Sequence, residues 1–433
     1  MNQERLNEIE KPLLHLVERD VVPALGCTEP ISLALAAATA AKYLGKTPER
    51  IEAKVSPNLM KNGLGVAVPG TGMVGLPIAA AIGALGGDPE GELEVLKHIT
   101  PEQVSQAKAM LDKKLVSVDI HQTDHILYSE AVLFTDNDRV KVAIQDQHTN
   151  IILIEKNGEV VFEKEHDECT DCDPYDIFKQ VSAREIFEFS CEVELDKIRF
   201  IRQAAALNRA LSDEGLRENY GLHIGRTLRK QVGSGLMSDD LLSKIMIETT
   251  AASDARMGGA MVPVMSNSGS GNQGICATNP VVVFAKENGN TPDELVRALT
   301  LSHLTAIYIK QNLGTLSALC GCIVACTGSS CGITYLMGGD YNNICYSIKN
   351  MIANLTGMIC DGAKPSCSLK ISSGVSTAIL SATLSMEGKC VTAAEGIIDN
   401  DVDKSIQNLT SIGKEAMCNT DDMVLNIMTN KCN

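Results

Sequence analysis

The hydrophobic pattern of this chain changes its period along the sequence, and this change limits the possible folds more than any other feature. Residues 115–163 alternate apolar and polar side chains, with Asp136-Asn137-Asp138 and Asn157-Gly158 available for turns. Such alternation is typical of strands joined by hairpins and predicts an antiparallel meander. From Val181 onward, apolar residues recur at helical spacing, with many Ala, Ser, Gly and Met residues. The sequence therefore predicts an α+β protein that is mostly helical.

An acidic stretch, residues 163–176, separates the two patterns. A chain of 433 residues exceeds the size at which one core keeps growing, so two domains are expected. We place an N-terminal α/β domain at residues 1–180, with its meander at about 115–163, and a helical C-terminal domain at residues 181–433. Cys169 and Cys172 form a CxxC in the acidic stretch, but no second cysteine or histidine pair lies nearby, which favours an exposed linker.

Composition and charge exclude several classes of partner. The formal net charge is −16, which argues against binding to nucleic acid or to an anionic membrane surface. No apolar run is long enough to span a bilayer, and the charged N-terminal residues do not resemble a signal peptide. We therefore expect a cytoplasmic protein that acts on a small molecule. Its Ala-, Gly- and Met-rich helices are compatible with a homodimer.

Cysteine is concentrated between Ser317 and Lys370, which hold seven of the chain's 15 cysteines. In a reducing compartment such a group binds metal, carries out redox chemistry or consists of small buried side chains. Three of these residues, Cys320, Cys360 and Cys367, are the candidate metal ligands, because the last two flank a tight polar turn. Spacing alone favours a metal cluster and simple buried thiols about equally.

Two further segments are candidates for chemistry. Cys27 lies just before a predicted helix at residues 31–43, where the helix dipole would favour a thiolate; the alternative is a small buried residue. A second segment is rich in Ser, Asn and Gly and could hold an anion, although a flexible solvated loop is the alternative. This segment comprises Ser266, Asn267, Ser268, Gly269, Ser270, Gly271 and Asn272, followed by Gln273 and Gly274. The glycine turn at residues 69–72 is a weaker ligand candidate, and His303 is expected to be a core histidine.

Several of these motifs together resemble a known family. GCTEP at residues 26–30, SNSGSGNQG at residues 266–274, and SALCGC and GMICDGAKPSC within residues 317–367 resemble the L-cysteine desulfidase family. That family is similar to the alpha portion of the iron–sulfur L-serine dehydratases. The resemblance covers nearly the whole chain. It implies a [4Fe–4S] cluster on Cys320, Cys360 and Cys367, with Cys322 as an alternative first ligand, and it implies that Cys27 is the proton acceptor.

The implied activity is that of a carbon–sulfur lyase. L-cysteine would place its carboxylate in the Ser/Asn/Gly segment and lose sulfide, and the products would be hydrogen sulfide, pyruvate and ammonia. Three alternatives stay open: the same chemistry on L-serine, a pyridoxal-phosphate lyase, and a non-catalytic iron–sulfur redox sensor. No lysine stands in a context that argues for a Schiff base. Cys432 is expected to lie outside the site.

Overall fold

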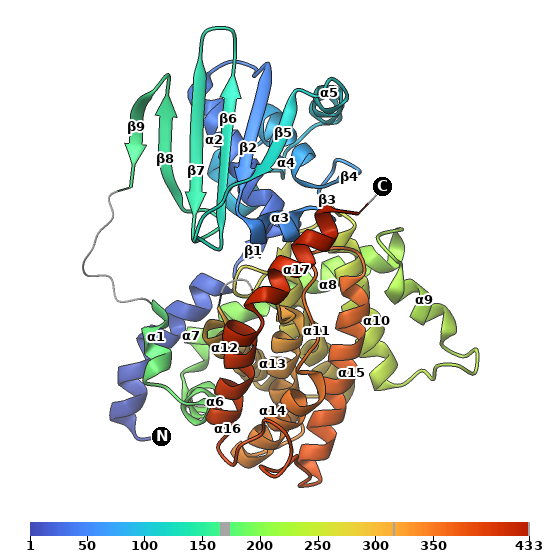
Figure 1. Ribbon diagram of the computed structural model, residues 1–433. Coiled ribbons are helices and arrows are strands. Elements are labelled where there is room, and N and C mark those ends of the chain that lie inside the picture. Colours follow the sequence, from blue (N-terminus) through green and yellow to red (C-terminus); the bar gives the residue numbers. More distant parts are fainter. Residues whose placement is uncertain (165–173, 315–316, 432–433) are drawn as a thin grey trace.

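A helix-backed sheet lies above a larger body of helices in this protein (Figure 1). The structure, a computed structural model, describes residues 1–164, 174–314 and 317–431. The helices and the sheet confirm the predicted α+β class with a mostly helical chain. The division into domains at residue 180 stays a prediction, and the CxxC of Cys169 and Cys172 lies outside the described residues, as does Cys432.

The main sheet has six strands in the order β5-β2-β6-β7-β8-β9. Its strands are β2 (Arg50–Val55), β5 (Val116–Ile120), β6 (Tyr128–Phe134), β7 (Arg139–Gln145), β8 (Ile151–Lys156) and β9 (Glu159–Glu163). Strands β6 to β9 form the predicted antiparallel meander.

The prediction was wrong for β5, which is not part of the meander. It pairs in parallel with β2, with Ile51 opposite Val116, so the sheet is mixed. Three helices connect β2 to β5, and such a crossover is what parallel pairing requires. Alternation within one strand carries no information about this distant partner.

Helices cover one face of the sheet, and their small residues let them approach closely. The connecting elements here are α2 (Thr28–Leu44), α3 (Pro57–Gly63), α4 (Leu76–Gly86), the 3₁₀ helix η1 (Pro89–Glu94) and α5 (Pro101–Asp112). A Cβ on Gly83 of α4 would lie 2.3 Å from the carbonyl oxygen of Ala34 in α2. The Ala-rich contact between α2 and α4 therefore depends on glycine at this position.

The helical half has a single large core around three central helices. Its elements are η2 (Pro174–Lys179), α6 (Ala183–Glu192), α7 (Leu195–Ile198), η3 (Arg199–Ile201), α8 (Arg202–Arg217), α9 (Ile224–Gln231), α10 (Leu241–Met257), α11 (Gly271–Asn288), α12 (Pro292–Leu313), α13 (Gly321–Leu336), α14 (Tyr341–Leu355), α15 (Cys367–Met386), α16 (Val402–Ser411), the π-helical turn η4 (Ile412–Ala416) and α17 (Cys418–Thr429). Helices α11, α12 and α13 are buried around most of their circumference, as expected of helices at the centre of a bundle.

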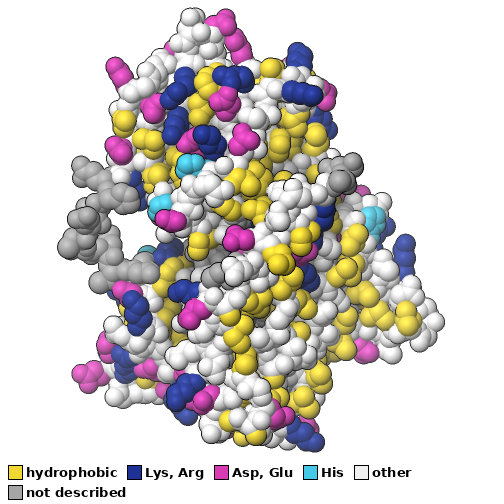
Figure 2. All heavy atoms as spheres, viewed as in Figure 1, with side chains coloured by type: hydrophobic (Ala, Val, Ile, Leu, Met, Phe, Trp, Pro, Cys, Tyr) yellow, Lys and Arg dark blue, Asp and Glu magenta, His cyan; other side chains and the backbone are white. Residues whose placement is uncertain are grey.

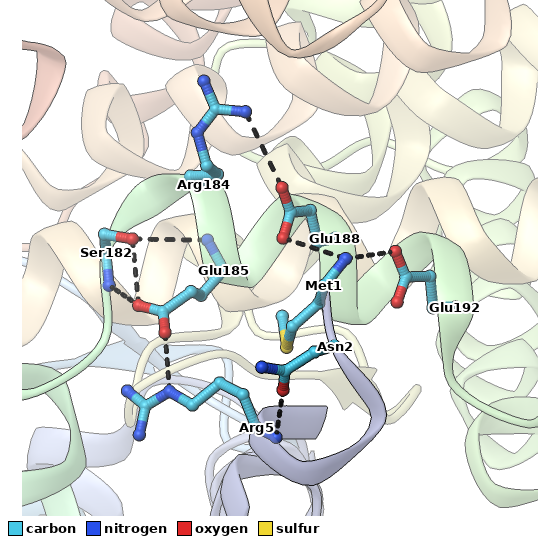
Figure 3. A network of polar contacts seen from close by, with 8 residues as sticks. All are labelled: Met1, Asn2, Arg5, Ser182, Arg184, Glu185, Glu188 and Glu192. Carbon is cyan, nitrogen blue, oxygen red and sulfur yellow. Dashed lines mark hydrogen bonds and ion pairs between the residues drawn. The ribbon is translucent and has the colours of Figure 1, made fainter. Parts of the chain in front are cut away.

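The main sheet and the helices α2 to α5 that cover it form what we call the sheet half. The first helix, α1 (Gln3–Asp20), contributes its apolar face to the helical core rather than to this sheet half. Figure 3 shows polar contacts that hold its start against α6. Arg5 donates to Glu185 at 2.7 Å, and the amino group of Met1 lies 2.9 Å from Glu192. Glu185 also completes the capping box of α6 with Ser182.

One short strand pair and the last helix connect the two halves. Strand β1 (Pro23–Ala24) pairs with β10 (Val264–Met265). A second short pair, β3 (Ala67–Val68) with β4 (Met73–Val74), lies within the sheet half. Helix α17 packs against α3, where Asp421 forms an ion pair with the fully buried Lys61. The C-terminal helix therefore reaches back to the sheet half (Figure 1).

The Ser/Gly segment is not the solvated loop that its composition allowed. Helix α11 begins at Gly271, capped by Ser270, so the second part of the segment is helical. Ser266 and Asn267 are fully buried. A Cβ on Gly274 would lie 1.9 Å from the carbonyl oxygen of Met265, so the helix packs directly on the loop before it.

The molecular surface has apolar side chains on the face that carries α15 and α17 (Figure 2). Exposed apolar residues of these two helices are Leu369, Leu380, Met423 and Ile427. A homodimer stays a prediction. Among the described residues, no helix combines the length and the apolar character needed to span a bilayer.

Replacing Gly274 by alanine should destabilise the protein, because the new Cβ would collide with backbone that cannot move independently. We expect the free energy of unfolding to fall by about 1–3 kcal/mol. Gly91→Ala is the matched control, since nothing lies within 4 Å of its Cβ position. Denaturant unfolding of both variants measures the effect, and equal stabilities would contradict this account of the packing.

Candidate functional site

One cavity, which we call the inner cavity, lies between the sheet half and the helical half. Its volume is about 90 Å³, room for a small molecule rather than for a nucleotide or a peptide. The lining residues are Cys27, Glu29, Asn62, His148, Arg256, Ser268, Gly269, Ser270, Asn272, Gln273, Lys310, Ser317, Leu319, Cys320, Gly321, Cys322, Cys360, Gly362, Ala363, Cys367 and Lys370. The structure thus brings Cys27, part of the Ser/Gly segment and the three candidate metal ligands to one place.

Four helices begin at the inner cavity. Cys27 is the N-cap of α2, Ser270 the N-cap of α11 and Cys320 the N-cap of α13, while Cys367 is the first residue of α15. The first amide groups of a helix have no partner within the helix, and its dipole is positive at this end. The cavity wall is therefore rich in N–H donors and favours negative charge.

The turn before α2 is fixed by residues from both halves. Gly26 has φ +76°, and a Cβ there would lie 2.3 Å from the ring of Pro69. Its carbonyl accepts a hydrogen bond of 3.1 Å from Nε of Arg256 in α10. Thr28 donates to the carbonyl of Gly269 at 2.7 Å, which ties the start of α2 to the Ser/Gly segment. The glycine turn at residues 69–72 thus supports the turn but does not line the inner cavity.

Burial opposes the thiolate that the position of Cys27 before a helix predicts. Burial raises the pKa of this thiol well above its usual value, and the charge of Glu29 raises it further. The thiol donates to Oε2 of Glu29 at 2.8 Å. Burial also acts to raise the pKa of Glu29, but His148, the Cys27 thiol and Arg256 outweigh it, and the net pKa is lowered. Cys27 and Glu29 therefore form a buried thiol–carboxylate pair.

The three candidate metal ligands line the same cavity on two connected segments. Cys320 donates its backbone N–H to the carbonyl of Met358, and Cys360 donates its own to the carbonyl of Ala318. Cys367 follows the polar turn, and burial raises the pKa of its thiol to about 12. None of these cysteines is in a disulfide. These two backbone hydrogen bonds hold the segment that carries Cys320 beside the segment that carries Cys360.

Metal binding by these three thiols stays a prediction. Within residues 1–164, 174–314 and 317–431, no three His, Cys, Asp or Glu side chains converge on one metal position. In a multi-iron cluster each thiolate binds a different iron, so its ligands surround the cluster without sharing one centre. Cys322 also lines the cavity, and its thiol interacts with those of Cys320 and Cys276. It therefore stays the alternative first ligand.

The Ser/Gly segment is divided between lining and support. Ser268, Gly269, Ser270 and Asn272 line the cavity, whereas Ser266, Asn267 and Gly271 do not. Asn267 donates at 3.0 Å to Nδ1 of His303, whose Nε2 lies 3.0 Å from the hydroxyl of Thr278. His303 is fully buried, in agreement with its prediction as a core histidine.

Two buried cations at the site were missed by sequence reasoning. Arg256 is 3% exposed and Lys310 is 4% exposed, and neither has an ion-pair partner among the described residues. Burial lowers the pKa of Lys310 to about 8. The signal that could have found them is a basic residue directly after a run of small or apolar residues, as in residues 249–256 and 304–310.

Four buried polar atoms of the cavity wall also lack partners. They are Oδ1 of Asn62, Nε2 of His148, Oδ1 of Asn272 and Oε1 of Gln273. Buried polar atoms in folded proteins are usually hydrogen bonded, so these four atoms are available to a ligand that enters the cavity. Acceptor oxygens and unpaired cations together match a ligand that carries both a positive and a negative group.

A larger cavity, which we call the vestibule, adjoins the inner cavity. Its volume is about 630 Å³. The two cavities share His148, Ser268, Gly269 and Lys310 in their walls. His148 approaches Gly269 closely, since a Cβ on that glycine would lie 3.2 Å from the imidazole. The vestibule and the inner cavity are therefore separated only by these shared residues.

Replacing Glu29 by glutamine should increase the reactivity of Cys27. The carboxylate charge raises the pKa of the thiol, so its removal lowers that pKa and increases the thiolate fraction. We expect faster alkylation of Cys27 by iodoacetamide at pH 8, measured by mass spectrometry of its peptide. Glu102→Gln, in the first turn of α5, is the control. Unchanged or slower alkylation would contradict the thiol–carboxylate pair.

Comparison with known proteins shows the family of this chain. The family model described as serine dehydratase alpha chain matches residues 90–426. A UPF0597 protein of Actinobacillus pleuropneumoniae is 56% identical over 427 residues, 98% of both chains. A UPF0597 protein of Bacteroides thetaiotaomicron is 52% identical over 422 residues, 97% of this chain and 98% of its own. This chain therefore belongs to the serine dehydratase alpha chain family.

Proposed function

We propose that this protein is an L-cysteine desulfidase that depends on a [4Fe–4S] cluster and eliminates sulfide from L-cysteine to give pyruvate and ammonia. The observation that carries the proposal is the content of the inner cavity. Its wall contains the three candidate ligand cysteines, a thiol–carboxylate pair and two buried cations that have no ion-pair partner in the described part of the chain. An elimination from a small amino acid needs a Lewis acid, a base for the α-proton and a binding site for the carboxylate, and these three groups could supply them in that order.

The unpaired polar and charged groups of the inner cavity could bind an amino acid. Arg256 and Lys310 can receive the carboxylate, helped by the amides at the start of α11. The unpartnered oxygens of Asn272 and Gln273 can accept hydrogen bonds from the ammonium group. A zwitterion would thus satisfy both kinds of group, whereas a simple anion would leave the two oxygens unpaired.

Cys320, Cys360 and Cys367 would hold the cluster. Their thiols form an all-sulfur donor set, and the nearby Lys370 and Arg256 offset negative charge at this wall. When bound through three thiolates, a [4Fe–4S] cluster has one iron without a protein ligand and supplies a Lewis acid.

Cys27 and Glu29 would act together as the base. The α-proton of the substrate moves to sulfur of Cys27, after the thiol has given its own proton to Glu29. The electron pair of the broken C–H bond forms the Cα–Cβ double bond, and the Cβ–S bond breaks with sulfur leaving as hydrosulfide. The aminoacrylate product tautomerises and is hydrolysed to pyruvate and ammonia. General-base catalysis of this kind contributes about 10²–10⁴-fold.

The same site could act on L-serine, and the family description favours this second candidate. The two reactions share the base, the carboxylate contacts and the products pyruvate and ammonia. They differ only in the leaving group, hydrosulfide or water. Pyruvate formation from each amino acid, with sulfide measured in parallel, separates them.

Anaerobic purification followed by iron, acid-labile sulfide and activity measurements tests the proposal. We expect about four irons per chain and sulfide release from L-cysteine. Cys360→Ala should lose both cluster and activity, because one of only three ligands is removed. Cys27→Ala should keep the iron and lose the activity. An iron-free protein that releases no sulfide after reconstitution would contradict the proposal.

Replacing Arg256 by methionine should weaken substrate binding. Hydrogen bonds to a charged group contribute about 1.5–3 kcal/mol, so KM for L-cysteine should rise about 10–100-fold. Arg209→Met is the control, because Arg209 lies on the exposed face of α8 and pairs with Asp213. Steady-state kinetics of the two variants gives the result. An unchanged KM in the Arg256 variant would exclude this residue from carboxylate binding.

A further inference from the structure

The thiol–carboxylate pair raises the question of where the substrate's proton goes. Each turnover delivers one proton to Cys27 and Glu29, and both side chains are buried, 2% and 9% exposed. Glu29 accepts hydrogen bonds from Cys27 and from Thr28, and Thr28 in turn donates to the carbonyl of Gly269. Neither neighbour leads to solvent. A base that cannot release its proton would stop after one turnover.

His148 is placed between this pair and the vestibule. It lies near enough to Glu29 for each to shift the pKa of the other. Its Nε2 atom is buried and has no hydrogen-bond partner. It belongs to the walls of both cavities, next to Gly269. No other titratable residue except Lys310 is shared by the two walls.

We propose that His148 is a proton relay that carries the proton from Glu29 to water in the vestibule. This inference rests on the proposed function, because it concerns the proton which that reaction removes from Cα. The balance of the step is simple. Glu29 loses the proton it received from Cys27 and becomes a carboxylate again, one nitrogen of His148 takes it up, and the other nitrogen releases a proton to water. His148 contacts no reacting carbon, so it acts through Glu29.

The geometry favours His148 over Lys310 for this role. Lys310 also faces both cavities, but with a pKa of about 8 it is mostly an ammonium group at neutral pH, and that form has no acceptor. A neutral imidazole has one donor and one acceptor nitrogen and can pass a proton between two sites. The unpartnered nitrogen of a buried histidine is costly to keep unless it has such a use.

Chemical rescue is the sharpest test, because the vestibule has room for a free base. We expect His148→Ala to lower kcat for sulfide release about 100-fold while KM for L-cysteine changes little. Added imidazole should restore kcat in a saturable manner. Pyrazole, which has the same shape but is far less basic, should not. His98→Ala, at an exposed histidine outside both cavities, should behave as the unsubstituted protein.

A second variant protects the test against misfolding. His148→Gln preserves most of the size and polarity of the side chain but cannot relay a proton, so it should stay slow. Circular dichroism and thermal unfolding establish that both variants are folded. Full activity of His148→Gln, or equal rescue of folded His148→Ala by imidazole and pyrazole, would overturn the relay.

Hydrogen exchange at Cα distinguishes failure of the relay from failure of the proposed function. L-cysteine incubated in D₂O with the unsubstituted protein should gain deuterium at Cα, and His148→Ala should do so slowly until imidazole is added. If the unsubstituted protein exchanges without releasing sulfide, the proposed function fails but the relay is supported by an imidazole-dependent exchange. A protein that shows neither exchange nor sulfide release overturns both.

Discussion

The hydrogen bond from Arg256 to the carbonyl of Gly26 is the contact on which the site depends most. It joins α10 of the helical half to the turn that carries Cys27, and the close approach of Pro69 allows only glycine at that turn. The guanidinium is held by a single backbone carbonyl and a thioether. Its charge lowers the pKa of Glu29, but among the described residues it has no carboxylate at ion-pair distance. Burying an unpaired charge is costly, so its retention at a cavity is explained best by an anionic ligand.

The four helix N-termini at the inner cavity also favour an anionic ligand. Each N-terminus adds unpaired amides and a positive dipole end to the wall. Cysteine occupies or adjoins three of these starts, at Cys27, Cys320 and Cys367. The dipole alone does not set the state of these thiols, however. At Cys27, burial and the charge of Glu29 dominate, so a base at this position would need activation by its neighbour.

Much of the fold could be predicted from the sequence because it is recorded in local patterns. The helices, the meander and the place of the Cys-rich segment follow from periodicity, turn residues and spacing. The parallel pairing of β5 could not be predicted, since it depends on a partner strand separated by three helices. Likewise, α1 packs on the helical core through contacts that its own amphipathic pattern does not specify.

The sequence predicted those residues of the candidate site that lie in recognisable motifs, and it missed the others. Cys27 and the three ligand candidates stand in recognisable motifs, and Glu29 stands in the same motif as Cys27. Arg256 and Lys310 are basic residues that follow runs of small or apolar residues in largely buried helices, which is a weak but usable signal. His148 lies in a polar turn after β7 with nothing to distinguish it, and only the three-dimensional arrangement brings it to Glu29.

The most direct test of the central claim is a crystal structure of the anaerobically purified protein with bound L-cysteine or a non-reactive analogue. The account predicts a metal cluster on Cys320, Cys360 and Cys367, a substrate carboxylate against Arg256, and Cα facing the sulfur of Cys27. An amino acid bound outside the inner cavity, or a cavity whose cysteines hold no metal in an iron-loaded protein, would contradict it.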